Sequence, residues 1–483
     1  MKKKLVVTMI ALFILAFSFV IAPKKANAIP AFAQKYHFSC AVCHTVFPNL
    51  NPFGRAFWRN GFRLPGTNGT PSDATQITEG LSLPNPWPIP IMVEPTISYQ
   101  HYTNENVSPQ TDAFSVSADV VDAGAFKLYT PLADSLSFYV HYKFGASSTG
   151  SSFKDKQIFA SINGLGAGFG VPSHLFNLKL GQVTTASPYF YRQAPFYITE
   201  GPVQNGQGLN VGYDGEGANL IHARNEGFAL YGTPGYHLWY KVTVTNDAGL
   251  GVGEAAHLVS SSGNNIEVSN AMEYSYQLKE YYPIPMGQLE FGYYGATVAE
   301  PVGTSQSTNG GVAAWTNRVT INGVDVDLAN DIYELGLTYM VQSDNHPYGN
   351  PSLASSNILL DNSVVGNTNS SNGYSTFEVY GRYLFPQIGN GLMLSADYAL
   401  YSWTHKDLQE GWINNNPTTC ENENLYQTGT YYSSNGCTNE GVKDAFAVQA
   451  EYNLAYNAHL YLGYLFTNKS QDNTIGTGLD FAF

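Results

Sequence analysis

The amino-acid sequence predicts an all-β fold: a transmembrane antiparallel β-barrel of about 16 strands over residues 91–483, with a small segment ahead of it. Many segments of about ten residues alternate apolar and polar side chains. Charged residues make up only 12% of the chain, whereas about 25% is usual in a soluble domain. Beyond residue 28, no stretch approaches the roughly 20 apolar residues of a membrane helix, which excludes a helical inner-membrane protein.

The alternation is clearest in the segments 114–120, 377–385, 392–400 and 446–454. Leu394 and Tyr398, for example, alternate with Ser395 and Asp397, so one face suits lipid and the other a watery lumen. A soluble β-sandwich alternates in the same way. The barrel is favoured because residues 475–483 alternate up to a terminal aromatic residue and so resemble the C-terminal recognition strand of bacterial outer-membrane barrels.

The strand number follows from the turns, counted back from a periplasmic C-terminus. Short turns at 455–458 and 386–391 then face the periplasm, and the Asn/Ser-rich segments 343–374 and 404–445 face outside. Continuing to residue 91 gives about 16 strands, with about 14 or 18 as alternatives, and both chain ends in the periplasm.

The first 28 residues read as a cleavable signal peptide. Lys2, Lys3 and Lys4 precede an apolar stretch at 5–22, and an Ala-Asn-Ala cleavage site ends at Ala28. A retained anchor is the alternative. Cleavage leaves 18 basic and 37 acidic residues, a net charge of −19, which argues against nucleic acid as a partner.

The motif that carries chemistry is Cys40-Ala41-Val42-Cys43-His44. In an exported protein this spacing indicates one covalently attached haem c, with Cys40 and Cys43 as thioether anchors and His44 as the iron ligand. The alternatives are a zinc site, a redox dithiol or a chance match. Zinc needs two further ligands nearby, and a dithiol enzyme needs a βαβ context that is absent from the sequence.

Residues 29–90 form a haem segment with little core of its own. We expect it to sit in the barrel as a plug. Its expected haem-packing residues are Phe32, Tyr36, Phe38, Phe47, Phe53, Phe57, Trp58 and Phe62.

The sixth ligand of the haem iron is left open by the sequence. Met92 is the first candidate, because a Met ligand would raise the redox potential, and an ordinary place in the barrel wall is its alternative role. His101 and His37 are weaker candidates.

Cys420 and Cys437 both fall on a segment predicted to face outside, where disulfides persist. We expect them to pair, which would stabilise the loop by about 3 kcal/mol. A redox-active pair is the alternative.

Four segments, 30–36, 40–44, 47–54 and 60–62, resemble the haem segment of the fused cytochrome-porins of iron-oxidising bacteria. The resemblance implies an outer-membrane oxidoreductase that takes electrons from extracellular ferrous iron at one haem and passes them to a periplasmic carrier protein. It also implies a barrel wall in contact with outer-membrane lipid. Two other functions stay open: a solute porin with a structural or sensory haem plug, and a conduit that reduces an extracellular acceptor.

Overall fold

The computed structural model describes residues 36, 38–46, 49–64, 76–78, 81–82, 91–102, 112–128, 130–147, 150–184, 224–235, 237–246, 272–303, 313–344, 372–403, 444–455, 458–467 and 474–481. The predicted signal peptide and the predicted Cys420–Cys437 disulfide lie outside these residues. Both therefore stay predictions.

The elements ahead of the barrel are η1 (Cys40–Val42), β1 (His44–Val46), β2 (Asn49–Leu50), α3 (Pro52–Arg59), β3 (Gln76–Thr78) and β4 (Leu81–Ser82). The barrel strands are β5 (Met92–Tyr102), β6 (Asp112–Lys127), β7 (Ser135–Ser147), β8 (Gly150–Asn163), β9 (Asn177–Thr184), β10 (Arg224–Gly232), β11 (Leu238–Asn246), β12 (Met272–Ile284), β13 (Gly287–Gly303), β14 (Ala313–Ala329), β15 (Tyr333–Asp344), β16 (Asn372–Phe385), β17 (Leu392–Trp403), β18 (Asp444–Ala455), β19 (Ala458–Thr467) and β20 (Thr474–Phe481). The short helix η2 (Ala167–Phe169) joins β8 to β9.

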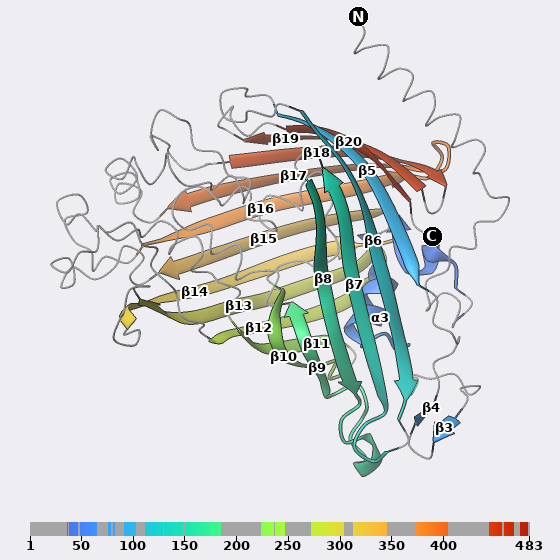
Figure 1. Ribbon diagram of the computed structural model, residues 1–483, viewed down its shortest axis with the longest axis vertical. Coiled ribbons are helices and arrows are strands. Elements are labelled where there is room, and N and C mark those ends of the chain that lie inside the picture. Colours follow the sequence, from blue (N-terminus) through green and yellow to red (C-terminus); the bar gives the residue numbers. More distant parts are fainter. Residues whose placement is uncertain are drawn as a thin grey trace, which may run out of the picture.

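These sixteen strands, β5 to β20, form one closed antiparallel barrel (Figure 1). Each strand pairs with its neighbours in the sequence, and the ring closes where β20 pairs with β5, from Thr474 opposite Tyr102 to Asp480 opposite Thr96. The predicted fold class and strand number are confirmed. Closure leaves no sheet edge, which a barrel in lipid requires.

The two faces of the barrel differ as the alternation predicts. On β17, Met393, Ser395 and Asp397 are buried and face inward, whereas Leu394 and Tyr398 are exposed on the outer wall. Large apolar side chains exposed on other strands include Val116, Phe144, Leu180, Phe228, Val242, Leu278, Phe291, Val324, Leu337, Val379, Phe446, Leu462 and Ile475. An apolar outer wall around a polar interior is the arrangement that suits lipid outside and water inside.

The helix α3 lies inside the ring of strands (Figure 1). Its Arg59 contacts Glu290 on β13, and Phe62, just beyond the helix, stacks on Tyr139 of β7. The chain at 36–64 therefore bridges the lumen, as expected of a plug, and its described residues are called the plug below. The plug lies near the mouth at which the short connections 285–286, 330–332 and 386–391 join the strands.

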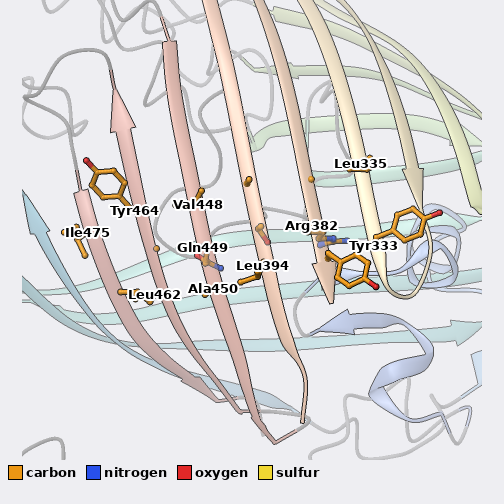
Figure 2. A pocket seen from close by; sticks show the side chains of 15 residues that line it. Tyr333, Leu335, Arg382, Leu394, Val448, Gln449, Ala450, Leu462, Tyr464 and Ile475 are labelled. Carbon is orange, nitrogen blue, oxygen red and sulfur yellow. The ribbon is translucent and has the colours of Figure 1, made fainter. Parts of the chain in front are cut away.

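A hollow of about 830 Å³ lies on the barrel wall over β15 to β20 (Figure 2). Leu335, Leu394 and Leu462, which line it, are exposed on the outer face. The hollow therefore faces away from the lumen and from the plug. Among the described helices, none is long and apolar enough to cross a membrane.

Candidate functional site

The C-x-x-C-H motif forms a tight turn at the start of the plug. Cys40–Val42 is a single 3-10 turn, in which the amide of Val42 donates to the carbonyl of Ser39 at 3.0 Å, and His44 begins β1 directly afterwards. The side chains of Cys43 and His44 are half-buried, and Cys43 is not part of a disulfide among the described residues. The turn thus presents a thiol and an imidazole next to each other on a fixed backbone.

Asn51 fastens this turn to α3. Its backbone amide donates to the carbonyl of Cys43 at 2.9 Å, and its side-chain amide donates to the carbonyl of Val42 at 3.0 Å. Its Oδ1 accepts from the amide of Gly54 at 2.9 Å, so the same side chain caps the helix, and Pro52 at the first helical position suits the cap.

Gly54 allows the helix to approach the motif closely. A Cβ atom at this position would collide with the carbonyl oxygen of Cys43. The Asn-Pro-Phe-Gly sequence at 51–54 therefore lets α3 begin directly against the motif turn.

Aromatic rings form an apolar surface beside the motif. The centroids of Tyr36 and Phe38 lie 5.6 Å apart, and Phe38 meets Phe53 edge to face at 5.8 Å. Tyr36 also meets Phe57 at 5.8 Å, and burial raises the pKa of Tyr36 to about 12. Apolar rings beside a Cys-and-His turn are suitable surroundings for a porphyrin, so these residues fit a haem.

Arg55 joins the plug to β14 and β15. Its guanidinium forms buried ion pairs with Asp327 and Glu334, and the hydroxyl of Tyr380 lies within hydrogen-bond distance of both carboxylates. Arg382 of β16 pairs with Glu334 as well. Burial opposes the charge on Arg55, but the two carboxylates raise its pKa well above the usual range. Arg55 therefore keeps its positive charge in this contact.

Arg59, one helical turn later, binds Glu290 of β13 through two hydrogen bonds of 2.7 Å. The Nζ of Lys279 lies 3.5 Å from the same carboxylate. The guanidinium also lies 5.7 Å from the ring centroid of Trp239 and 5.3 Å from that of Tyr281. Both partners of the Arg59–Glu290 pair are 2% exposed, so water screens it little.

Arg63 ends the series of basic residues spaced by four. It donates to Oδ1 of Asn177 at 2.7 Å and to the carbonyl of Ser173 at 3.0 Å, and it lies 3.7 Å from Asp134. These partners stand at the β8–β9 end of the wall. Arg55, Arg59 and Arg63 therefore hold the plug to separate parts of the barrel.

Phe62 packs the plug against β7 and β8. Its ring stacks on Tyr139 at 6.1 Å and on Phe159 at 6.4 Å, and Phe57 joins the same buried cluster. Gly61 has a positive φ of 66°, and a Cβ atom there would collide with the amide oxygen of Asn163. Gly61 therefore permits both the positive φ of this turn and the close approach of the chain to the wall.

The other residues predicted for the haem site are placed as follows. Cys40 stands at the start of η1, and Met92 is the first residue of β5, half-buried and on the same face as Thr96. His101 stands on β5, and His37 lies outside the described residues.

The sequence analysis missed two groups of residues. The first is the basic series 55, 59 and 63 with its acidic partners; its four-residue spacing in a chain poor in charge was a usable signal. The second is a polar group on the wall, made of the buried His459 and Glu451 and the half-buried Asn453. Among the described residues, no set of three or more His, Cys, Asp and Glu side chains is arranged to hold a metal ion.

Comparison with known proteins finds no family model and no curated sequence that matches this chain. Solved structures do match. A mutant porin of Rh. blastica has 10% identity and a TM-score of 0.39, with 82% of this chain and 99% of that chain covered. OmpF of Salmonella typhi, in a complex with daunomycin, has 11% identity and a TM-score of 0.41, with 82% and 97% covered. At this identity the likeness concerns the barrel alone.

One expectation from the sequence is wrong. The chain was expected to be a ferrous-iron-oxidising oxidoreductase, whereas the similar structures named above are porins, which are passive channels. The resemblance to fused cytochrome-porins is supported for its porin-like barrel. The haem-binding half of that resemblance stays a prediction.

Proposed function

We propose that this chain is a solute porin of the outer membrane whose lumen is narrowed by an N-terminal plug carrying one covalently attached haem c. The observation that carries the proposal is the union of two features in one short segment. The C-x-x-C-H turn is built onto α3, and α3 is fastened by buried arginines to the inner wall of a closed sixteen-strand barrel.

The haem is proposed from the motif and its surroundings. Cys40 and Cys43 would hold the porphyrin, and His44 would bind its iron. The rings of Phe38 and Phe53 would cover its apolar surface. When bound, the group supplies a one-electron redox centre and a rigid apolar core for a segment that has little core of its own.

The proposed orientation follows from loop length. Outer-membrane barrels have short turns on the periplasmic side and longer loops outside. The plug lies near the mouth with the short connections, so we place it at the periplasmic end, with β5 beginning and β20 ending on that side. The apolar outer wall then contacts membrane lipid.

The plug residues also indicate how solute flow is limited. Arg55 and Arg59 occupy the lumen, and their wall partners Asp327, Glu334 and Glu290 are used to hold them rather than to line an open path. The resting conductance should therefore be low. It should rise when these ion pairs are removed.

The test uses the full chain in planar lipid bilayers, with haem content measured by the pyridine haemochrome assay on denatured protein. We expect one covalent haem per chain and a several-fold rise in conductance when Arg55 and Arg59 are both changed to Met. Asn322→Ala, on the outer wall, is the matched control and should leave the conductance unchanged. A chain without covalent haem would refute the proposal, and so would a conductance that is unchanged when Arg55 and Arg59 are both Met.

A further inference from the structure

The hollow on the outer wall follows the pairing of the strands from β15 to β20. Six of its lining residues stand opposite one another on these six strands and form one row across the wall: Leu335, Gly381, Ala396, Val448, Tyr464 and Ile475. The hollow, of about 830 Å³, is therefore a groove that runs across the strands (Figure 2). We call it the outer groove.

Small side chains form the floor of the outer groove. Gly381 pairs with Ala396, and Ala450 stands opposite Leu394 in the neighbouring row. Leu394 and Leu462, which flank Ala450 across the strands, are exposed and much larger. The volume falls within the range of about 300–1,000 Å³ that is usual for ligand sites. The groove is therefore large enough to hold part of a ligand molecule.

The two ends of the outer groove differ in chemistry. At one end Tyr333, the first residue of β15, stands opposite Tyr383, whose ring lies 4.6 Å from that of Phe385. The hydroxyl of Tyr333 donates to the carbonyl of Met286 at 2.7 Å, in the short β12–β13 connection. At the other end lies Ile475, the second residue of β20, far from that mouth. Tyrosines at one end suit a membrane–water interface, and an aliphatic residue at the other suits the bilayer interior.

The direction of the groove matches one leaflet of a membrane. Five strand spacings of about 4.8 Å make the row about 24 Å long. Strands of outer-membrane barrels tilt by about 40°, so a row across them climbs about 15 Å along the membrane normal. This climb is half of a hydrocarbon core about 30 Å thick. The groove thus runs from one interface to about the middle of the bilayer.

The lining favours a hydrocarbon chain over a second copy of the protein. Neither the row through Ala396 nor the row through Leu394 contains a charged side chain. A second copy that met this face about a two-fold axis would set hollow against hollow, and both would stay unfilled. An unfilled hollow loses the dispersion contacts of its lining. A flexible acyl chain can follow a groove that is one small side chain deep.

We propose that the outer groove binds one acyl chain of a phospholipid of the periplasmic leaflet. The headgroup lies beside Tyr333 and Tyr383, and the chain runs toward Ile475. The inference rests on the membrane orientation given in the proposed function, and it does not depend on the haem. On the inner face of the same wall, Glu334 and Arg382 alternate with the groove residues and pair with each other. The bound lipid therefore lies behind the part of the wall that holds the plug.

The test uses the full chain in detergent, with dipalmitoyl phosphatidylethanolamine as the probe and native mass spectrometry as the readout. We expect one lipid per chain to survive a collision energy that removes all others, and added lipid to raise the thermal midpoint. Ala396→Phe and Ala450→Phe each fill the groove and should weaken lipid binding at least tenfold. Ala160→Phe, on the outer face of β8 opposite the exposed Leu180, is the matched control and should keep the lipid.

An unmodified chain that retains no lipid would overturn the proposal, and this measurement needs no variant to fold. A lipid kept equally by both filled variants would overturn it too. So would a dimer that separates in Ala396→Phe, because a second copy would then occupy the groove, or a preference for lipid A, because the site would then face the other leaflet. The haem content and the conductance of the chain test the proposed function separately.

Discussion

The ion pair between Arg59 and Glu290 gives the sharpest test of how the plug is held. Removing one partner of a buried ion pair costs about 3 to 5 kcal/mol, because the other charge is left buried. The two ends are not equivalent here. Arg59→Met leaves Glu290 with Lys279 at 3.5 Å, whereas Glu290→Gln leaves the buried guanidinium of Arg59 facing a neutral amide while Lys279 keeps its ion pair with Asp325.

We therefore expect Glu290→Gln to destabilise the folded protein by about 5 kcal/mol and Arg59→Met by about 3 kcal/mol. Combining the two changes should cost at least about 2 kcal/mol less than their sum, because neither charge is then left alone. The measurement is the urea midpoint of the chain in detergent micelles, followed by tryptophan fluorescence. In parallel, the fraction of open time is recorded in planar bilayers.

The control for this experiment is Asn322→Ala, which removes an outer-wall contact with Tyr276 and leaves the lumen untouched. It should change neither the open fraction nor the coupling. A double variant whose cost is simply additive would show that the plug is not held by this pair. Equal costs for the two single variants would show that Lys279 does not compensate for the loss of Arg59.

Three further predictions concern the plug: two its joint between the motif and the helix, and one its packing against the wall. Asn51→Ala should lower the stability of the haem-loaded plug by about 1 kcal/mol, the usual value of a lost helix cap. The loss should be seen as a change of haem absorbance at a lower temperature on heating, and an unchanged curve would argue against the cap. Gly54→Ala should reduce the yield of covalent haem on denaturing gels, because its Cβ meets the carbonyl of Cys43, whereas Ala56→Ser should not; equal yields would contradict this. Phe62→Ala should cost about 3 to 5 kcal/mol in the urea midpoint and Phe62→Leu clearly less, and a null result would show that the aromatic stack contributes little.

The barrel was predictable because its information is local and repeated. The alternation around Leu394 and Ser395 predicts one strand, and the same pattern recurs in other strands. The pairs that hold the plug carry no such pattern. Arg59 and Glu290 are 231 positions apart, and Arg55 and Asp327 are 272 apart. Periodicity cannot link a helix residue to one position on one of sixteen strands.

The motif itself shows the same division. The spacing of Cys40, Cys43 and His44 is a local signal that needs no partner strand. Asn51 as a helix cap was also readable in principle, because Asn-Pro before a helix is a known start signal.

The pairing of β20 with β5 bears on the order in which the protein is assembled. The plug precedes every barrel strand in the sequence, yet the barrel closes only when its last strand pairs with its first. The plug, whose arginines bind different sides of the lumen, cannot easily enter the barrel after closure. If the plug carries the proposed haem, its attachment to Cys43 would precede closure of the barrel. A defect in haem attachment would then reduce membrane insertion of the barrel before it reduced the haem absorbance of the inserted protein.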